Sequence, residues 1–276
     1  MAFHFVNSSL KEANTVILGI PYDRSSSYIP GSRFAPQFVR IGADNVETYS
    51  PYFKQDIRKI KIYDAGDIVL NYPSVAQTFS QIREEIKKYI KEKKRIISLG
   101  GEHTITVPIV SEIVKYFPDL NLIQLDAHSD TRDTYLGEKY SHATVIKRIS
   151  EIIPNNRIFQ LGLRSLFVPA TKNQYLFKVA EYIDGIKKKI KTMPCYLTLD
   201  IDVLDCGIMP AVQTAVPGGI SYQELFQSIL KMSELNIIAC DIVEYNPLAS
   251  PNLGYASVVA EILRELILMM NKNKKM

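Results

Sequence analysis

Histidines and aspartates with the spacing of metal ligands are the most informative feature of this sequence. The stretch LDAHSDTRD, residues 125–133, contains three aspartates and a histidine directly after the apolar run NLIQ. Unpaired carboxylates repel one another and lose solvation where water is excluded, so we expect a cation beside them. Similar residues occur in GGEHT at 100–104 and in LDIDVLD at 199–205. The candidate metal ligands are His103, Asp126, His128, Asp130, Asp200 and Asp202.

The chemistry of this set predicts the type of metal centre. Two imidazoles and four carboxylates, with no thiolate in the same motifs, suit hard or borderline divalent ions. Mn²⁺ fits this description better than a structural zinc ion does. Four carboxylates also carry more negative charge than one divalent ion neutralises. We therefore predict a centre of two Mn²⁺ ions, about 3.5–4 Å apart, that activates a water molecule for hydrolysis.

Each motif also has a purely structural interpretation. Asp200 and Asp202 could point to one face of a strand, or they could be a helix cap and a turn residue. His103, after two glycines, could be a capping or buried polar residue. The joint pattern favours the metal centre, because the chain has only four histidines and two of them lie in these motifs. A third, His142, follows shortly afterwards in YSHAT, whereas His4 lies outside any pattern.

The elements that must position these residues are short apolar runs that alternate with helical segments. The runs are TVILGI (15–20), IKIYDAG (60–66), RIISLGG (95–101), LNLIQLDAH (120–128), RIFQLGLRS (157–165), CYLTLDIDVLD (195–205) and NIIACDIVEYNP (236–247). Segments 74–94, 106–117 and 221–235 place apolar residues three or four apart, which is typical of helices. The alternation predicts an α/β fold with three layers, α/β/α, around a central, mostly parallel sheet.

Nearly every apolar run ends in charged residues, histidine or glycine. Because ligands of open α/β sheets bind outside the carboxyl ends of the strands, we expect these distant motifs to converge on one site. No linker, repeat or low-complexity block divides the chain. We therefore expect a single catalytic domain over residues 1–276.

Bulk composition argues against several other classes of protein. The net charge is +4, but lysine-rich stretches such as 82–95 fit a solvated helix face better than a nucleic-acid surface. The cysteines, Cys195, Cys206 and Cys240, share no metal-finger spacing and are odd in number, which fits a reducing compartment. Residues 1–14 lack a basic leader, and no apolar run approaches the length of a membrane span. We expect a cytoplasmic protein that binds neither nucleic acid nor membranes.

The motifs GGEHT, LDAHSDTRD, YSHAT, LDIDVLD and DIVEYNP, in this order, resemble those of the ureohydrolase family. This family comprises arginase, agmatinase and formimidoylglutamase, which are binuclear manganese enzymes with an α/β/α fold. The stretches GIPYDRSSSYIPGSRFAPQFVR and ETYSPYF resemble the agmatinase branch. The resemblance also implies a homo-oligomer, either a trimer or a hexamer. It implies that one ion is held by His103, Asp126, Asp130 and Asp200, and the other by Asp126, His128, Asp200 and Asp202.

The resemblance further implies catalytic roles. The family hydrolyses a guanidino or related amidine carbon, and Asp130 is placed to accept a proton from the attacking water. Glu244, in DIVEYNP, matches the acid that binds the substrate guanidinium in a bidentate pair. His142 matches the proton shuttle that delivers a proton to the leaving amine. Without the metal motifs, Glu244 would be interpreted as a salt-bridge residue and His142 as a polar residue near a helix start.

The resemblance to agmatinases implies a small cationic guanidino substrate, with agmatine, cleaved to putrescine and urea, as the leading candidate. Arginases bind the amino-acid head group partly with an asparagine two positions after the last DAHxD aspartate, and this chain has Arg132 there. An arginine suits a bidentate carboxylate contact, so guanidinobutyrate is a second candidate. Arg132 could equally pair with Asp133. Arginine and formiminoglutamate are further alternatives.

The segment CGIMPAVQTAVPGG, residues 206–219, departs from the family pattern because Ala211 and Gln213 replace two glycines. Glycines allow positive φ or close backbone approach, so we expect a reshaped loop at 211–216 that affects the substrate rather than the metals. A one-zinc deacetylase of the same fold is a weaker hypothesis, because all six ligands of a two-metal centre are present. A non-catalytic metal-binding homologue is the remaining alternative.

Overall fold

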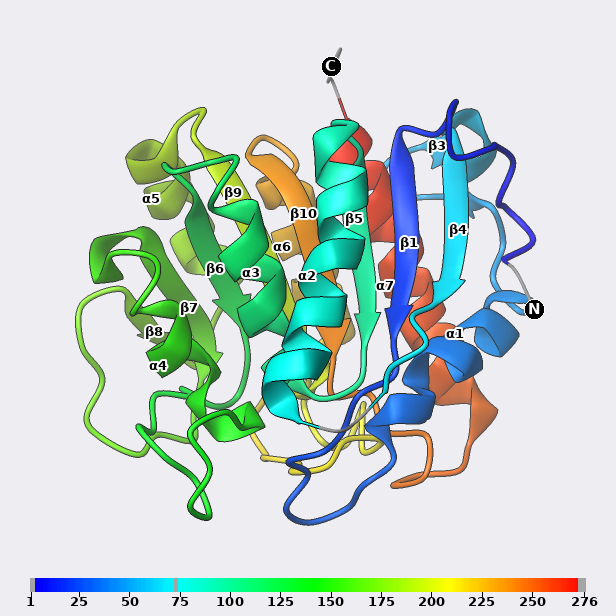
Figure 1. The fold of residues 1–276 in the computed structure, drawn as a ribbon. Helices are drawn as coiled ribbons and strands as arrows, with labels where there is room; N and C mark the ends of the chain where they lie inside the picture. The colour runs from blue at the N-terminus through cyan, green and yellow to red at the C-terminus, as the bar shows by residue number, and fades with distance from the viewer. Residues whose placement is uncertain (1–2, 72–73, 273–276) are drawn as a thin grey trace.

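An eight-stranded parallel sheet runs through the centre of the molecule (Figure 1). The computed structural model describes residues 3–71 and 74–272. The strand order is β4-β1-β5-β10-β9-β6-β7-β8, and neighbouring strands are parallel throughout. The strands are β1 (Thr15–Ile20), β4 (Ile62–Asp67), β5 (Arg95–Gly100), β6 (Asn121–Leu125), β7 (Ile158–Leu163), β8 (Gln174–Leu176), β9 (Pro194–Asp200) and β10 (Asn236–Val243). A small antiparallel pair, β2 (Tyr49–Ser50) and β3 (Gln55–Asp56), lies outside this sheet.

Helices cover both faces of the sheet. The helices on the face towards the viewer in Figure 1 are α2 (Val75–Lys91), α3 (Thr106–Ile113) and α4 (Val145–Ile149). Those on the opposite face are α1 (Ala35–Ala43), α5 (Ala180–Ile190), α6 (Tyr222–Met232) and α7 (Leu253–Asn271). The three-layer α/β/α fold predicted from the sequence is therefore confirmed. None of the described helices is both long and apolar enough to cross a membrane.

The strands are apolar without alternation because both of their faces are buried. In β1, Val16 and Leu18 pack in the core beneath α2, together with Ile82 and Ile86. Ile17, which points the other way, packs in the core on the opposite face. Side chains of a strand alternate between its two faces, so a strand covered by helices on both sides needs apolar residues at every position. Burial of each such aliphatic side chain contributes about 1.5–3 kcal/mol to the free energy of folding.

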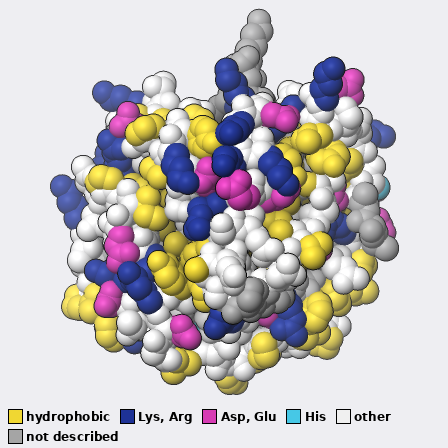
Figure 2. Space-filling model, in the orientation of Figure 1, with side chains coloured by type: hydrophobic (Ala, Val, Ile, Leu, Met, Phe, Trp, Pro, Cys, Tyr) yellow, Lys and Arg dark blue, Asp and Glu magenta, His cyan; other side chains and the backbone are white. Residues whose placement is uncertain are grey.

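The amphipathic helix α2 shows why a lysine-rich sequence can cover such a core. Ser74 begins the helix, because its hydroxyl accepts a hydrogen bond from the backbone N–H of Gln77. On the outer side, Lys87 pairs with the neighbouring acid Glu84 at 3.3 Å. Figure 2 shows lysine and arginine side chains interspersed with acidic ones over this face of the molecule. This arrangement fits the solvated helix face predicted for 82–95.

All seven apolar runs predicted as strands belong to the sheet, and the three predicted helices correspond to α2, α3 and α6. The strand β8 and the β2–β3 pair were not predicted, because two or three residues are too few to show a period. The carboxyl ends of four adjacent strands, β5, β10, β9 and β6, meet at the lower edge of the sheet in Figure 1. The motifs GGEHT, DIVEYNP, LDIDVLD and DAHSD lie at these four ends.

Candidate metal centre

His103 follows β5 and begins a short 3₁₀ helix. Gly101 lets the backbone just before His103 come close to the loop after β1. A Cβ at this position would lie 1.8 Å from a backbone carbonyl oxygen of that loop. The Nε2 atom of His103 lies 2.9 Å from Thr198 Oγ1, and Thr198 donates its hydroxyl proton to Asp241 at 2.6 Å. Thr198 can then only accept from His103, so Nε2 carries the ring proton. The lone pair of Nδ1 is left for a metal.

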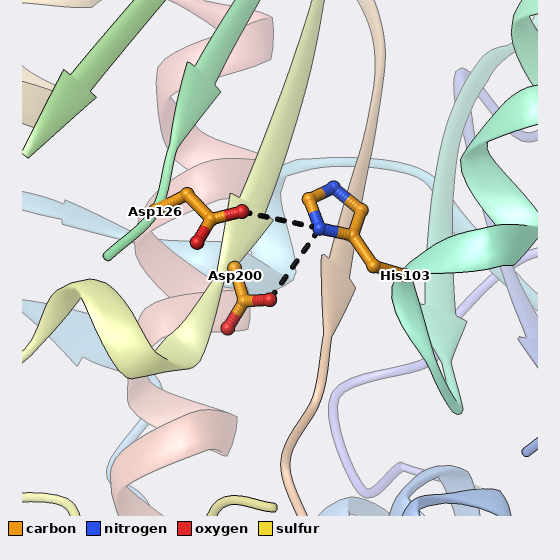
Figure 3. Close-up of side chains that lie close together, drawn as sticks. All are labelled: His103, Asp126 and Asp200. Atoms are coloured by element: carbon orange, nitrogen blue, oxygen red, sulfur yellow. Dashed lines mark ion pairs between the residues drawn. The ribbon is translucent and has the colours of Figure 1, made fainter. Parts of the chain in front are cut away.

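Carboxylates surround this nitrogen. His103 Nδ1 lies 3.2 Å from Asp126 Oδ2, 3.1 Å from Asp130 Oδ2 and 3.4 Å from Asp200 Oδ2. Figure 3 shows His103 turned towards Asp126 and Asp200, whose carboxylates converge on the same ring nitrogen. The nitrogen is buried and makes no hydrogen bond of good geometry within the described residues. A buried lone pair facing several carboxylates fits a cation held between them.

A second group lies next to the first. His128 Nδ1 is 2.8 Å from Asp202 Oδ2 and 3.7 Å from Asp126 Oδ1. Among the described residues there are thus two groups of candidate ligands, and within each group the ligand atoms lie within 4.8 Å of one another. One is His103 with Asp126 and Asp200, and the other is Asp126 with His128 and Asp202. Asp126 belongs to both groups. Asp130 reaches the first through its contact with His103.

The backbone around the aspartates is held by the same carboxylates. Asp126 Oδ1 accepts a hydrogen bond from the N–H of His128, and Asp200 Oδ1 accepts one from the N–H of Asp202. Asp202 Oδ1 accepts from the N–H of Ala127, which ties the segment after β6 to the segment after β9. Asp200 therefore ends its strand and caps the 3₁₀ helix Ile201–Val203. The interpretation of Asp200 as a helix cap is therefore correct, and Asp200 also belongs to the cluster of candidate metal ligands.

Electrostatics show that the protein alone does not neutralise these carboxylates. Burial raises the pKa of Asp200 well above its usual range, and the carboxylates of Asp202 and Asp126 raise it further. Burial lowers the pKa of His128, but the same two carboxylates outweigh this effect and raise it to about 12. Without a cation the cluster therefore retains protons that a metal would displace. Its oxygen and imidazole donors suit a divalent ion such as Mn²⁺.

Two of the predicted catalytic acids have an unusual backbone conformation. Asp130 and Glu244 have φ angles of 49° and 65°, in the region that usually favours glycine. Such residues cost about 1–3 kcal/mol each and often occur at functional sites. The unusual turn at Glu244 aims its carboxylate back towards β5, where Oε1 accepts from the backbone N–H of His103 at 2.7 Å. Its Oε2 is buried and has no hydrogen-bond partner in the described part of the chain.

His142 is linked to the loop after β1. Its Nδ1 lies 3.1 Å from Ser25 Oγ, which also accepts from the His142 backbone N–H at 3.0 Å. Ser25 donates its hydroxyl proton to Glu102 Oε1 at 2.8 Å, and Thr104 donates to the same oxygen. Burial, with smaller contributions from the imidazoles of His128 and His103, lowers the pKa of His142 to about 4. The ring is thus anchored through one nitrogen.

A cavity of about 160 Å³, lined mainly by polar and charged residues, joins these groups. Its wall includes His103, His128, Asp130, Asp200, Asp202, His142, Glu244, Arg132 and Tyr135. The guanidinium carbon of Arg132 lies 4.1 Å from the ring centre of Phe167 and 5.5 Å from that of Tyr135. Asp133 pairs with Arg148 at 2.6 Å, so the suggested pairing of Arg132 with Asp133 is not found. Arg132 is thus positioned at the cavity by aromatic rings.

The altered loop 206–219 also borders the cavity, through Thr214. Neither Ala211 nor Gln213 has a positive φ, whereas Gly218 has a φ of 80°. Asp205 holds the end of the loop by accepting a hydrogen bond from the N–H of Gly218 at 2.7 Å. The backbone at 211 and 213 therefore has a conformation that non-glycine residues adopt readily.

Several residues that support the site were not singled out from the sequence. Ser25 and Glu102 lie within motifs that were recognised, but nothing in their spacing showed that they would meet His142. Thr198 lies two positions before Asp200, and its place on the same strand face was the available signal. Asp241 is buried and accepts hydrogen bonds from Thr198, Tyr196 and Thr106.

Similarity to known proteins extends over nearly the whole chain. The model of the arginase family matches residues 13–269. The agmatinase of Bacillus anthracis is 35% identical over 269 residues, which cover 94% of this chain and 93% of that protein. The agmatinase of Bacillus subtilis is 34% identical over 267 residues, covering 94% and 92%. The crystal structure of the agmatine ureohydrolase of Thermoplasma volcanium matches with a TM-score of 0.88 and 29% identity, covering 98% of this chain and 94% of that one.

Proposed function

The chain belongs to the arginase family, and from this premise we propose that it hydrolyses agmatine to urea and putrescine. In this reaction the oxygen of water adds to the guanidino carbon, the bond from that carbon to the substituted nitrogen breaks, and this nitrogen gains a proton. The products are urea and a diamine, and no oxidant or reductant is required. Two of the similar proteins named above are agmatinases, which favours agmatine among the guanidino compounds.

The observation that carries this proposal is the shared cavity. Its wall holds three imidazoles and several carboxylates, among them Glu244, whose buried Oε2 has no hydrogen-bond partner among the described residues. A guanidinium group is planar and remains cationic, and it donates two parallel N–H bonds to a carboxylate. Glu244 would bind the substrate in this way and hold the guanidino carbon beside the aspartates.

We propose that two Mn²⁺ ions occupy the cluster. The residues that would hold them are His103, Asp126, Asp130 and Asp200 for one ion, and Asp126, His128, Asp200 and Asp202 for the other. When bound, the ions supply a nucleophile at neutral pH by lowering the pKa of a water molecule. The orphaned Nδ1 of His103 and the uncompensated carboxylates support this proposal.

The remaining steps are proton transfers by the chain. Asp130 lines the cavity and would accept the proton that the attacking water loses. His142 would deliver a proton to the leaving nitrogen. Because Ser25 donates its single hydroxyl proton to Glu102, it can only accept from His142, so Nδ1 carries a fixed proton. The lowered pKa of His142 keeps the ring neutral near pH 7, so Nε2, the nitrogen left for the substrate, would first take up a proton and then pass it to the leaving nitrogen.

A second candidate substrate is guanidinobutyrate, and the position of Arg132 favours it. Agmatine ends in an ammonium group, which the positive charge of Arg132 repels, whereas the carboxylate of guanidinobutyrate would pair with it. Both candidates place the same guanidino group against Glu244. They differ only in the charged group at the other end of the molecule.

Three further expectations belong to this proposal and rest on the family resemblance and the sequence. They are a single catalytic domain over residues 1–276, a trimeric or hexameric assembly, and a cytoplasmic location.

Urea release by the Mn²⁺-loaded protein tests the proposal. Agmatine, guanidinobutyrate, arginine and formiminoglutamate are compared, with formamide measured for the last. We expect kcat/KM to be highest for agmatine. A protein that binds Mn²⁺ but hydrolyses none of the four substrates would be the non-catalytic homologue, and the proposed function would then be wrong.

A further inference from the structure

Three glutamines lie side by side on the adjacent strands β6, β7 and β8. Gln124 is paired in register with Gln160, and Gln160 is paired with Gln174. Gln124 and Gln160 are buried, and Gln174 is half-buried at the edge of the sheet. Buried amides must find hydrogen-bond partners, and the partners here lead to the metal centre. We refer to these three residues as the glutamine ladder.

The ladder is a continuous chain of hydrogen bonds that ends on Asp126. Gln124 Nε2 donates to Asp126 Oδ2 at 2.5 Å, and Gln160 Nε2 donates to Gln124 Oε1 at 2.5 Å. Gln174 Nε2 donates to Gln160 Oε1 at 2.6 Å. At the outer end, the backbone N–H and the hydroxyl of Thr171 donate to Gln174 Oε1. Every amide in the row therefore points the same way.

This direction follows from the chemistry of the inner end. An ionised carboxylate only accepts hydrogen bonds, so Gln124 must turn its NH₂ group towards Asp126 and its carbonyl oxygen towards Gln160. Gln160 and Gln174 must then take the same orientation. A flip of any one amide would bring two donors or two acceptors together, so the ladder has one satisfied arrangement.

Gln160 also holds the segment that contains two of the proposed ligands. Its Nε2 donates a second hydrogen bond, to the carbonyl oxygen of Ser129 at 2.7 Å. Ser129 lies between His128 and Asp130, and Asp130 has the positive φ described above. The ladder thus contacts both a ligand side chain and the backbone between two other ligands.

We propose that the glutamine ladder positions Asp126 and the segment 128–130 for metal binding. The inference rests on the proposed metal-binding function of these residues. Asp126 accepts one hydrogen bond on each carboxylate oxygen, from the N–H of His128 on Oδ1 and from Gln124 on Oδ2. This pair of donors fixes the rotation of the carboxylate and leaves each oxygen a lone pair for an ion. Loss of such partners of metal ligands typically weakens metal binding by about 10–100-fold.

The test is the affinity of the metal-free, full-length protein for Mn²⁺, measured by titration calorimetry. Gln160→Met keeps the length and volume of the side chain but removes both donated bonds. We expect its dissociation constant for Mn²⁺ to rise by about 10–100-fold. Gln174→Met removes only the hydrogen bonds of the outermost glutamine, and we expect a smaller loss of affinity for Mn²⁺. This second variant leaves the inner amides in place, so it tests the ladder even if Gln160→Met fails to fold.

Asn121→Leu is the matched control. Asn121 is a buried amide on the same strand as Gln124, at its opposite end, where it donates to backbone carbonyl oxygens of Asp119 and Pro194. We expect this variant to be less stable to heat but to bind Mn²⁺ with wild-type affinity. Wild-type affinity in both ladder variants would overturn the inference and leave the proposed function intact. A wild-type protein that binds no Mn²⁺ would overturn both.

Discussion

Glu244 accepts a hydrogen bond from the backbone N–H of His103 at 2.7 Å, which joins the end of β10 to the turn after β5. The bond uses Oε1, while Oε2 is buried beside the cavity without a partner in the described residues. Burial, together with the charge of Glu102, raises the pKa of Glu244 to about 8. A bound guanidinium would reverse this effect by favouring the ionised form. Glu244 is thus held by the backbone through Oε1, and Oε2 together with the second lone pair of Oε1 is left for a guanidinium.

Glu244→Gln is therefore expected to impair the binding of a guanidinium without disturbing the metals. The amide has the shape of the acid and can still accept from His103, but it carries no charge. A hydrogen bond to a charged group contributes about 1.5–3 kcal/mol, so we expect kcat/KM for agmatine to fall by about 100-fold. Steady-state urea release gives this value, and metal analysis should find an unchanged Mn²⁺ content. An unaltered kcat/KM would exclude Glu244 as the guanidinium ligand.

Ser25→Ala tests the anchoring of His142. The substitution removes the acceptor for Nδ1–H and also one of the hydroxyl donors to Glu102. General acid catalysis contributes about 10²–10⁴-fold, and a misplaced shuttle should lose part of it, so we expect kcat to fall by about 10–100-fold. The KM for agmatine should change little, because Glu244 remains in place. Pre-steady-state and steady-state measurements of urea release separate the effect on kcat from the effect on KM.

Ser26→Ala provides the control for this variant. Ser26 is the next residue in the same loop, and its hydroxyl is buried without a hydrogen-bond partner among the described residues. Loss of this hydroxyl removes a similar volume but no contact with His142. We expect kcat to stay within about two-fold of wild type, since the barrier should change by less than about 0.5 kcal/mol. Equal losses of kcat in both variants would indicate a general effect on the loop rather than on His142.

The fold and the clustering of the candidate ligands could be predicted because both depend on strand ends. Long apolar runs identify the buried strands, and polar residues directly after them must lie at one edge of a parallel sheet. This is why residues as distant in sequence as His103, Asp126 and Asp200 could be assigned to one site. The short strand β8 could not be found in this way, because it has three residues and none of them is buried.

The hydrogen-bond partners of the site could not be predicted for a different reason. They depend on which strands are neighbours in the sheet, and the order of the strands in the sequence does not determine this. β10 lies between β5 and β9, which lets Asp241 reach Thr198, and β6 lies between β9 and β7. Gln124 and Gln160 occupy equivalent positions of their strands only once this pairing and its register are known.

Metal binding should release protons. In the metal-free protein, the carboxylates around His128 raise its pKa to about 12, and the pKa of Asp200 is also raised. His128 therefore holds a proton near neutral pH and must lose it to act as a ligand, and the raised pKa of Asp200 acts in the same direction. We expect the apparent affinity for Mn²⁺ to rise with pH, by about tenfold per pH unit for each proton released. Calorimetry in two buffers with different enthalpies of protonation measures the number of protons released. Identical heats in both buffers would contradict the prediction.

Arg132→Met should shift substrate preference towards agmatine. Arg132 lines the cavity and its guanidinium lies against Phe167 and Tyr135, so its charge is held at the cavity wall. That charge repels the ammonium end of agmatine and attracts the carboxylate of guanidinobutyrate. Its removal should therefore raise the ratio of kcat/KM for agmatine to that for guanidinobutyrate, by about tenfold if the interaction changes by about 1.4 kcal/mol.

Arg132→Lys separates the effect of charge from that of geometry. A lysine keeps the positive charge but loses the planar group that stacks on aromatic rings and binds carboxylates through two bonds. If charge alone sets the preference, this variant keeps the wild-type ratio of the two kcat/KM values. If the bidentate contact matters, turnover of guanidinobutyrate falls in Arg132→Lys while that of agmatine does not. An unchanged ratio in Arg132→Met would show that Arg132 does not contact the distal end of either substrate, and the preference would then have to arise from the loop around Thr214.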